Sequence, residues 1–330
     1  MIIPKLLLFL ATISFTLESP VQIKSPERSD DKDHEKAKSN TLRLVTIVMR
    51  HGDRAPQDTY PNDPYVNNSM EPYGWGQLTN EGRRNQYNQG LFLRERYSHF
   101  LGPTYSPDIF YLQCTAVDRT KMSAMLEAAA LWKPNEKQSF KPDLPWQPVT
   151  LFYQPRSEDT KHMKLTLPEW TNDYYPDKLI PLTLYDLQLN VYNDPLKRLK
   201  GGPFLKKIVI DMLAKKDNTL KPQERKMFMY IGHDSSIVSL LDVMHVWNNQ
   251  IPNYNIMTMI ELHEDSCGWN VQVFLRNTTE REPYRLTIPG CTTICPLEKF
   301  IHILKPMIPD NWEEECKVDG DYTLPPAPVP

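Results

Sequence analysis

Apolar residues along this chain gather in short continuous runs separated by polar segments. The first run, residues 42–49, is mostly apolar from end to end, which is typical of a strand buried on both faces. Residues 110–115 and 227–231 form two further runs of strand length. Residues 257–262 and the alternating segment 269–275 predict an antiparallel hairpin.

Helix-spaced repeats follow several of these strands. After the glycine-rich turn at residues 74–76, Thr79 can cap a helix that runs to about residue 97. Two later segments place apolar side chains on one face at helical spacing. These are Met122, Leu126, Ala129 and Ala130 in the first segment, and Ile237, Leu240, Leu241 and Met244 in the second. Strand–loop–helix units that recur in this way predict an α/β sandwich with a largely parallel sheet.

The two ends of the chain lack the pattern of a folded core. Residues 1–19 combine a positively charged start with an apolar stretch, 6–15, that is short for a membrane span. They predict a signal peptide, with a membrane anchor as the alternative. Residues 20–40 are charged and predict a disordered linker, and residues 317–330 predict an extended tail. We therefore expect a soluble protein without a membrane anchor, secreted or lysosomal, that enters the secretory pathway.

Composition narrows the classes of partner. The 330 residues carry a net charge of −3, which gives no basic field for nucleic acid. No spacing of His, Asp or Cys indicates a metal site, so we expect no metal and no other cofactor. Asn67 and Asn277 begin Asn-x-Ser/Thr triplets, which fit a secreted glycoprotein.

The candidate chemistry lies directly after the first strand. Arg50-His51-Gly52-x-Arg54-x-Pro56 places one imidazole between two guanidiniums, with Gly52 allowing a sharp turn and Pro56 stiffening the exit. Two planar donor forks around one uncharged nitrogen nucleophile fit a phosphoryl group. The motif therefore predicts that His51 attacks phosphorus while Arg50 and Arg54 hold its oxygens.

A second motif, Gly232-His233-Asp234, follows the strand predicted at residues 227–231. Like the first motif, it falls just past the end of a strand and just before a helix. Open α/β sheets bind ligands at this edge, and helix N-termini favour anions there. This pattern favours a single pocket that contains both motifs.

Together these motifs resemble the histidine acid phosphatases, the branch of the histidine phosphatase superfamily marked by RHGxRxP and a distant His-Asp. The likeness continues through residues 76–79, 117–120 and 289–296, and it covers most of residues 41–316. The resemblance implies a phosphoglycerate-mutase-like three-layer α/β sandwich with both motifs in one pocket. It also implies hydrolysis of phosphate monoesters through a phosphohistidine.

In that family a helical cap interrupts the core and roofs the pocket. Here the core would comprise residues 41–154 and 201–316, and the segment between them, 155–200, is short and poorly periodic. The triplet at 168–170, Pro-Glu-Trp, resembles a point near the middle of the family's cap, so the first half of the cap looks deleted. We expect a reduced helical cap.

The resemblance also implies how the site divides its roles. Arg50, Arg54 and His233 would neutralise the phosphoryl oxygens. Asp234 would donate a proton to the leaving alkoxide and later accept one from water, which implies activity at acidic pH. Asp234 favours a phosphatase over a phytase, because phytase relatives usually carry Ala-Glu after the second histidine. Small phosphate monoesters are the expected partners, and a homodimer is left open.

One position departs from the family pattern. The family carries a third phosphate-binding arginine where this chain has Gln113, and an aspartate where it has Ala116. A neutral amide in place of a charged clamp costs about 2–4 kcal/mol in the transition state, roughly 30- to 1,000-fold in rate. Arg119 matches a separate family arginine, so we do not expect it to take over this charge. The sequence predicts a weakened site in which Gln113 faces the substrate.

Two functions remain in view. The favoured one is an acid phosphatase of broad monoester specificity. The alternative is a catalytically impaired secreted homologue that binds phosphorylated ligands or acts as a venom or salivary component. Gln113 and the shortened cap favour this alternative.

The five cysteines leave one odd. Cys291 and Cys295 lie where the family has a local disulfide, so the resemblance implies that they pair. Cys316 matches a family cysteine whose own partner is absent here. It either pairs with Cys114 or Cys267 or stays free.

Overall fold

The computed structural model describes residues 41–57, 63–154 and 179–317. The predicted signal peptide, the predicted linker and the tail from residue 318 lie outside the described residues. Much of the predicted reduced cap, residues 155–178, lies outside them as well.

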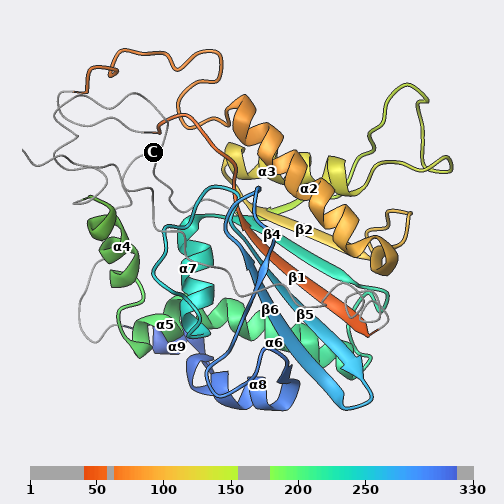
Figure 1. Ribbon diagram of the computed structural model, residues 1–330, viewed down its shortest axis with the longest axis vertical. Helices are drawn as coiled ribbons and strands as arrows, with labels where there is room; N and C mark the ends of the chain where they lie inside the picture. The colour runs from red at the N-terminus through yellow and green to blue at the C-terminus, as the bar shows by residue number, and fades with distance from the viewer. Residues whose placement is uncertain (1–40, 58–62, 155–178, 318–330) are drawn as a thin grey trace, which may run out of the picture. The chain divides into compact units, whose positions relative to one another are not determined.

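A mixed β-sheet forms the centre of the described core (Figure 1). Its strands run in the order β3–β2–β4–β1–β5–β6–β7, and β8 pairs with β6. The strands are β1 (Leu42–Arg50), β2 (Phe110–Thr115), β3 (Phe152–Gln154), β4 (Met227–Gly232), β5 (Met257–Asp265), β6 (Gly268–Arg276), β7 (Tyr284–Leu286) and β8 (Cys295–Pro296). β3, β2, β4 and β1 are parallel neighbours, whereas β5 to β8 are antiparallel. The predicted α/β sandwich and its hairpin are confirmed.

Helices cover both faces of this sheet (Figure 1). α2 (Asn80–Leu101) and α3 (Asp118–Leu131) lie on one face, and α6 (Gly202–Lys216), α7 (Asp234–Val243) and α8 (Leu297–Leu304) lie on the other. The remaining described helices are α4 (Leu179–Leu189), α5 (Asp194–Lys200), the 3₁₀ turn η2 (Lys305–Met307) and α9 (Trp312–Glu315). The two helical layers explain why strands β1 and β4 are apolar on both faces.

β1 shows this double burial residue by residue. Val45, Ile47 and Met49 pack into the core beneath α2 and α3. Leu44 and Val48, on the opposite side of the strand, pack into the core beneath α6, α7 and α8. Because side chains alternate along a strand, burial on both faces requires the continuous apolar run seen in the sequence.

α2 begins where its capping residue predicts. The hydroxyl of Thr79 accepts a hydrogen bond from the backbone N–H of Gly82 at 3.1 Å, which satisfies one donor of the first turn. The helix continues to Leu101, beyond the predicted end near residue 97.

The buried face of α3 differs from the predicted apolar stripe. Met122, Leu126 and Ala129 are only partly buried, and small or polar residues face the interior instead. The cause is the close approach of α2. A Cβ at Gly90 would lie 2.5 Å from the carbonyl oxygen of Glu127, so the two helix backbones touch at this point and leave no room there for a side chain on α2.

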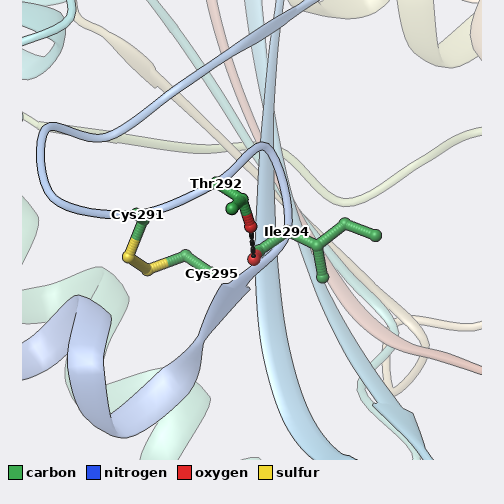
Figure 2. Close-up of a disulfide and its surroundings, with 4 residues drawn as sticks. All are labelled: Cys291, Thr292, Ile294 and Cys295. Atoms are coloured by element: carbon green, nitrogen blue, oxygen red, sulfur yellow. Dashed lines mark hydrogen bonds between the residues drawn. A yellow bond between two sulfur atoms is a disulfide. The ribbon is translucent and has the colours of Figure 1, made fainter.

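The second half of the core contains the implied disulfide. Cys291, in the loop before β8, is bonded to Cys295 at the start of β8, and within that loop the hydroxyl of Thr292 donates to the carbonyl of Ile294 at 2.6 Å (Figure 2). The other three cysteines, at positions 114, 267 and 316, are free thiols, so Cys316 has no disulfide partner. Across the part of the chain that the structure describes, none of the helices is long and apolar enough to span a bilayer.

Glu127 is a buried carboxyl group that the α2–α3 packing encloses. It is 0% exposed, and neither of its side-chain oxygens has a hydrogen-bond partner among the described residues. Burial raises the pKa of this carboxyl well above its ordinary value of 4.5. Glu127 is therefore neutral in the folded protein under acidic conditions.

Glu127 consequently makes stability depend on pH. Its folded-state pKa is raised, so its contribution is fully present below the unfolded pKa and is lost as pH rises toward the folded pKa. We predict that Glu127→Gln, which stays neutral, raises Tm more at pH 7 than at pH 4, by roughly 2–4 °C for each kcal/mol of relieved cost. Thermal unfolding of both proteins across that range checks this. An equal difference at both pH values would contradict it.

Candidate active site

The register of two parallel strands brings the two sequence motifs together. Arg50 at the end of β1 pairs with Gly232 at the end of β4. The backbone N–H of His51 donates to the carbonyl of Gly232 at 3.1 Å, and the His51 and His233 ring centroids are 5.7 Å apart. The predicted shared location of the motifs therefore follows from one strand pairing.

Gly52 is required by a close approach of the chain to α2. A Cβ at this position would lie 2.7 Å from the carbonyl oxygen of Gly82 and 2.9 Å from Cγ of Gln86. The sequence interpretation was that Gly52 allows a sharp turn, but Gly52 does not adopt a positive φ. Glycine is needed here because a side chain would collide with α2. Gly82 is constrained in the same way, since its Cβ would collide with the backbone of Asp53.

The ring of His51 is 1% exposed and is oriented by its first nitrogen. Nδ1 lies 2.8 Å from the carbonyl oxygen of Gly52, which can only accept, so Nδ1 carries the proton. Nε2 is then the ring nitrogen that carries the lone pair. Nε of Arg119 donates toward it at 3.2 Å.

Arg50 is held by three different groups. Nη2 forms an ion pair with Oδ2 of Asp234 at 2.9 Å, and Nη1 donates to the carbonyl of Pro252 at 2.5 Å. The guanidinium carbon also lies 4.1 Å from the centre of the Tyr254 ring, within cation–π range. The ion pair places the predicted acid and a predicted phosphate-binding cation in direct contact.

Arg54 is 1% exposed, and its Nη1 donates to the carbonyl of Ala55 at 2.9 Å. Its backbone pairs with Leu78 in an isolated bridge just before the α2 cap. Burial raises the pKa of the nearby Tyr254 phenol, whereas the positive charges of Arg54 and Arg50 lower it; the net direction is upward. Tyr254 is therefore a neutral ring that contacts one buried cation, Arg50.

A buried amide network supports this loop from behind. Asn255 has a φ of 63°, a left-handed conformation that asparagine tolerates better than most residues. Its amide nitrogen donates to Asp53 at 3.1 Å, and its oxygen accepts from Gln86 at 2.5 Å. Gln86 also donates to the carbonyl of Arg50 at 3.3 Å. These bonds connect α2 to the segment that carries His51.

His233 contacts the end of β2. Its Nε2 lies 3.0 Å from the hydroxyl of Thr115, which is 2.9 Å from the hydroxyl of Thr120. Thr120 donates to a backbone carbonyl, at Val117 or Thr115, and so accepts from Thr115. Thr115 then accepts from His233, which places a proton on Nε2 of that ring.

Similarity to known proteins agrees with this arrangement. A family model described as the histidine phosphatase superfamily (branch 2) matches residues 41–167. Prostatic acid phosphatase of Rattus norvegicus is 34% identical, over 83% of this chain and 89% of the relative. The venom acid phosphatase of Apis mellifera is 30% identical, over 83% of this chain and 87% of the relative.

The chain belongs to the histidine phosphatase superfamily. Lysosomal acid phosphatase of Bos taurus is 29% identical, over 86% of this chain and 82% of the relative. Among solved structures, a phytase from Citrobacter braakii has a TM-score of 0.54 at 16% identity, over 84% of this chain and all of that one. At that identity the phytase supports the fold alone, and the expected α/β architecture is confirmed.

Gln113, where the sequence analysis expected a family arginine, lies in β2. It lies on the same strand face as Thr115, two residues before it, and its Oε1 accepts from the hydroxyl of Tyr111 at 3.0 Å. The expectation that Gln113 faces the substrate stays a prediction.

The structure adds residues that sequence reasoning did not place at the site. Tyr254 and Asn255 come from the loop before β5, and Thr115 comes from the end of β2. Arg119 was set aside as a separate arginine, yet it contacts His51. Only the position of Thr115 past an apolar strand gave a signal in the sequence. Within residues 41–57, 63–154 and 179–317, no three His, Cys, Asp or Glu side chains cluster as metal ligands.

Proposed function

We propose that this chain is an acid phosphatase that hydrolyses phosphate monoesters through a phosphohistidine at His51. The observation that carries the proposal is the orientation of one ring. Nδ1 of His51 donates to the carbonyl of Gly52, so the lone pair of Nε2 points toward the buried guanidinium of Arg119. The names of the curated relatives support the same activity.

In the first half-reaction, Nε2 attacks phosphorus and the bond to the ester oxygen breaks. Arg50 and Arg54 contact the phosphoryl oxygens and neutralise the charge that they carry in the transition state. His233, whose ring is oriented by its contact with Thr115, is a third phosphoryl contact in this proposal.

Asp234 manages the protons of both half-reactions. It donates a proton to the leaving alkoxide, and as a carboxylate it then accepts one from the water that attacks phosphohistidine. A phosphoryl group that binds Arg50 competes with the ion pair at 2.9 Å and releases Asp234 for protonation. Because an aspartic acid donates only when protonated, the first half-reaction is favoured at acidic pH.

A finer part of the proposal concerns rate. Gln113 provides no charge where the family pattern has an arginine, so the transition state is stabilised less than in a site that has this arginine. The same observation favours the second candidate, a secreted homologue that binds phosphorylated ligands with little turnover. The survival of His51, His233 and Asp234 in one pocket favours turnover.

Export is the remaining part of the proposal. It rests on the apolar stretch at residues 6–15 and on relatives named as prostatic, venom and lysosomal enzymes. Of the two predicted glycosylation sites, Asn67 is exposed. The amide nitrogen of Asn277 instead donates to Gln250 at 2.6 Å and to Ile251 at 3.3 Å, so glycosylation is expected at Asn67.

Turnover of a simple monoester tests the main proposal. We predict that the purified protein releases phosphate from an aryl phosphate at pH 5 and that His51→Ala lowers kcat at least about 1,000-fold, because the nucleophile is lost. A Tm for His51→Ala close to that of the unchanged protein controls for folding. Equal rates for the two proteins would reject this function.

The leaving group tests the role of Asp234. We predict that Asp234→Asn lowers kcat for alkyl phosphates about tenfold more than for nitrophenyl phosphate, because the nitrophenolate leaves without a proton. Rates on both substrates, measured with the same protein, give this ratio directly. Equal losses on both would show that Asp234 does not protonate the leaving group.

A further inference from the structure

The guanidinium of Arg119 contacts the proposed nucleophilic atom, Nε2 of His51. Its Nε lies 3.2 Å from Nε2 of His51, and the residue is 3% exposed. The sequence comparison gave no reason to place it there, because the family's third phosphate-binding arginine aligns with Gln113. In the structure, the additional positive charge next to His51 therefore comes from Arg119 and not from position 113, where the family pattern places it.

The backbone of α3 fixes Arg119 relative to His51. Arg119 is the second residue of that helix, and its carbonyl accepts from the hydroxyl of Ser123 at 2.7 Å. The same Ser123 oxygen accepts from the N–H of Gly52, next to His51, at 3.2 Å. Ser123 thus connects the backbone of Arg119 to the backbone next to His51. This connection fixes the positions of the two residues relative to each other.

Gln113 does not supply the missing positive charge. Its Oε1 accepts from the hydroxyl of Tyr111 at 3.0 Å, so the oxygen end of the amide is engaged along its own strand. An amide carries no net charge, whereas the Arg119 guanidinium is always charged and offers several donors in a plane. Of these two side chains, Arg119 alone can neutralise a phosphoryl oxygen.

We propose that Arg119 is a further phosphate-contacting residue of this site and supplies the charge that is absent at Gln113. The proposal rests on the proposed function, in which Nε2 of His51 bonds to phosphorus. In the resting site the Arg119 donor faces the Nε2 lone pair. When that lone pair bonds to phosphorus, the donor moves to a phosphoryl oxygen on the same phosphorus.

The step balances without proton transfer from Arg119. The N–P bond forms as the P–O bond to the leaving group breaks, and the leaving alkoxide takes its proton from Asp234. Arg119 stays charged throughout and contributes only hydrogen bonds and charge.

Phosphate affinity separates this role from a purely orienting one. An arginine that only orients His51 would affect kcat and leave the binding of inorganic phosphate unchanged. An arginine that contacts the phosphoryl group affects both. Calorimetric titration with inorganic phosphate at pH 5 measures the affinity without any turnover.

We predict that Arg119→Gln weakens phosphate binding about tenfold or more and lowers kcat/KM about 30- to 1,000-fold. Arg119→Lys, which keeps the charge but loses the planar donor pair, is expected to lose about tenfold in affinity. Arg225→Lys is the matched control, since Arg225 is a buried arginine whose Nη1 donates to Pro107 near the opposite end of β4. It should stay within about twofold of the unchanged protein.

A second substitution tests whether an arginine at position 113 can replace the charge of Arg119. Gln113→Arg should raise kcat/KM more in the Arg119→Gln background than in the unchanged protein, because a new cation matters most where one is missing. Additive effects of the two changes would contradict the proposal.

Phosphate affinity within about twofold of the unchanged protein in Arg119→Gln would also overturn it, and Arg119→Lys serves the same test if the glutamine variant does not fold. Failure of the proposed function is recognised separately, as turnover by the unchanged protein no faster than by His51→Ala.

Discussion

The site depends on three buried guanidiniums that lie near the imidazole of His51, because their positive charges must be stabilised by the groups around them. Arg50, Arg54 and Arg119 are each less than a tenth exposed, and like charges held in a low-dielectric interior repel one another. Several groups around the guanidiniums offset this repulsion. Backbone carbonyls accept from Arg50 and Arg54, the ring of Tyr254 faces Arg50, and Asp234 forms an ion pair with Arg50. Such a site favours a bound anion.

Strand register and close packing keep the arginines in place. β1 and β4 end together, so the backbone of His51 bonds to Gly232 and both motifs open toward one point. The absent Cβ atoms of Gly52 and Gly82 let the motif loop lie directly against α2. Asn255 then links that loop to Gln86 on the same helix.

Local sequence patterns predicted much of the fold but few of the residues that surround and position the site. The apolar run of β1 and the Thr79 cap are local signals, and the structure follows both. The buried face of α3 could not be inferred, because it depends on the separation from α2 at Gly90. Tyr254 and Arg119 reach the site through contacts between distant segments, which no spacing along the chain encodes.

The account depends on Nε2 of His51 as the atom that receives the phosphoryl group. Brief reaction with a ³²P-labelled monoester at pH 5, an alkaline quench and peptide mapping by mass spectrometry test this most directly. The predicted result is an acid-labile, base-stable label on the peptide that contains His51, absent from the His51→Ala protein. Label on any other residue, or a turning-over enzyme that never carries label, would contradict the account.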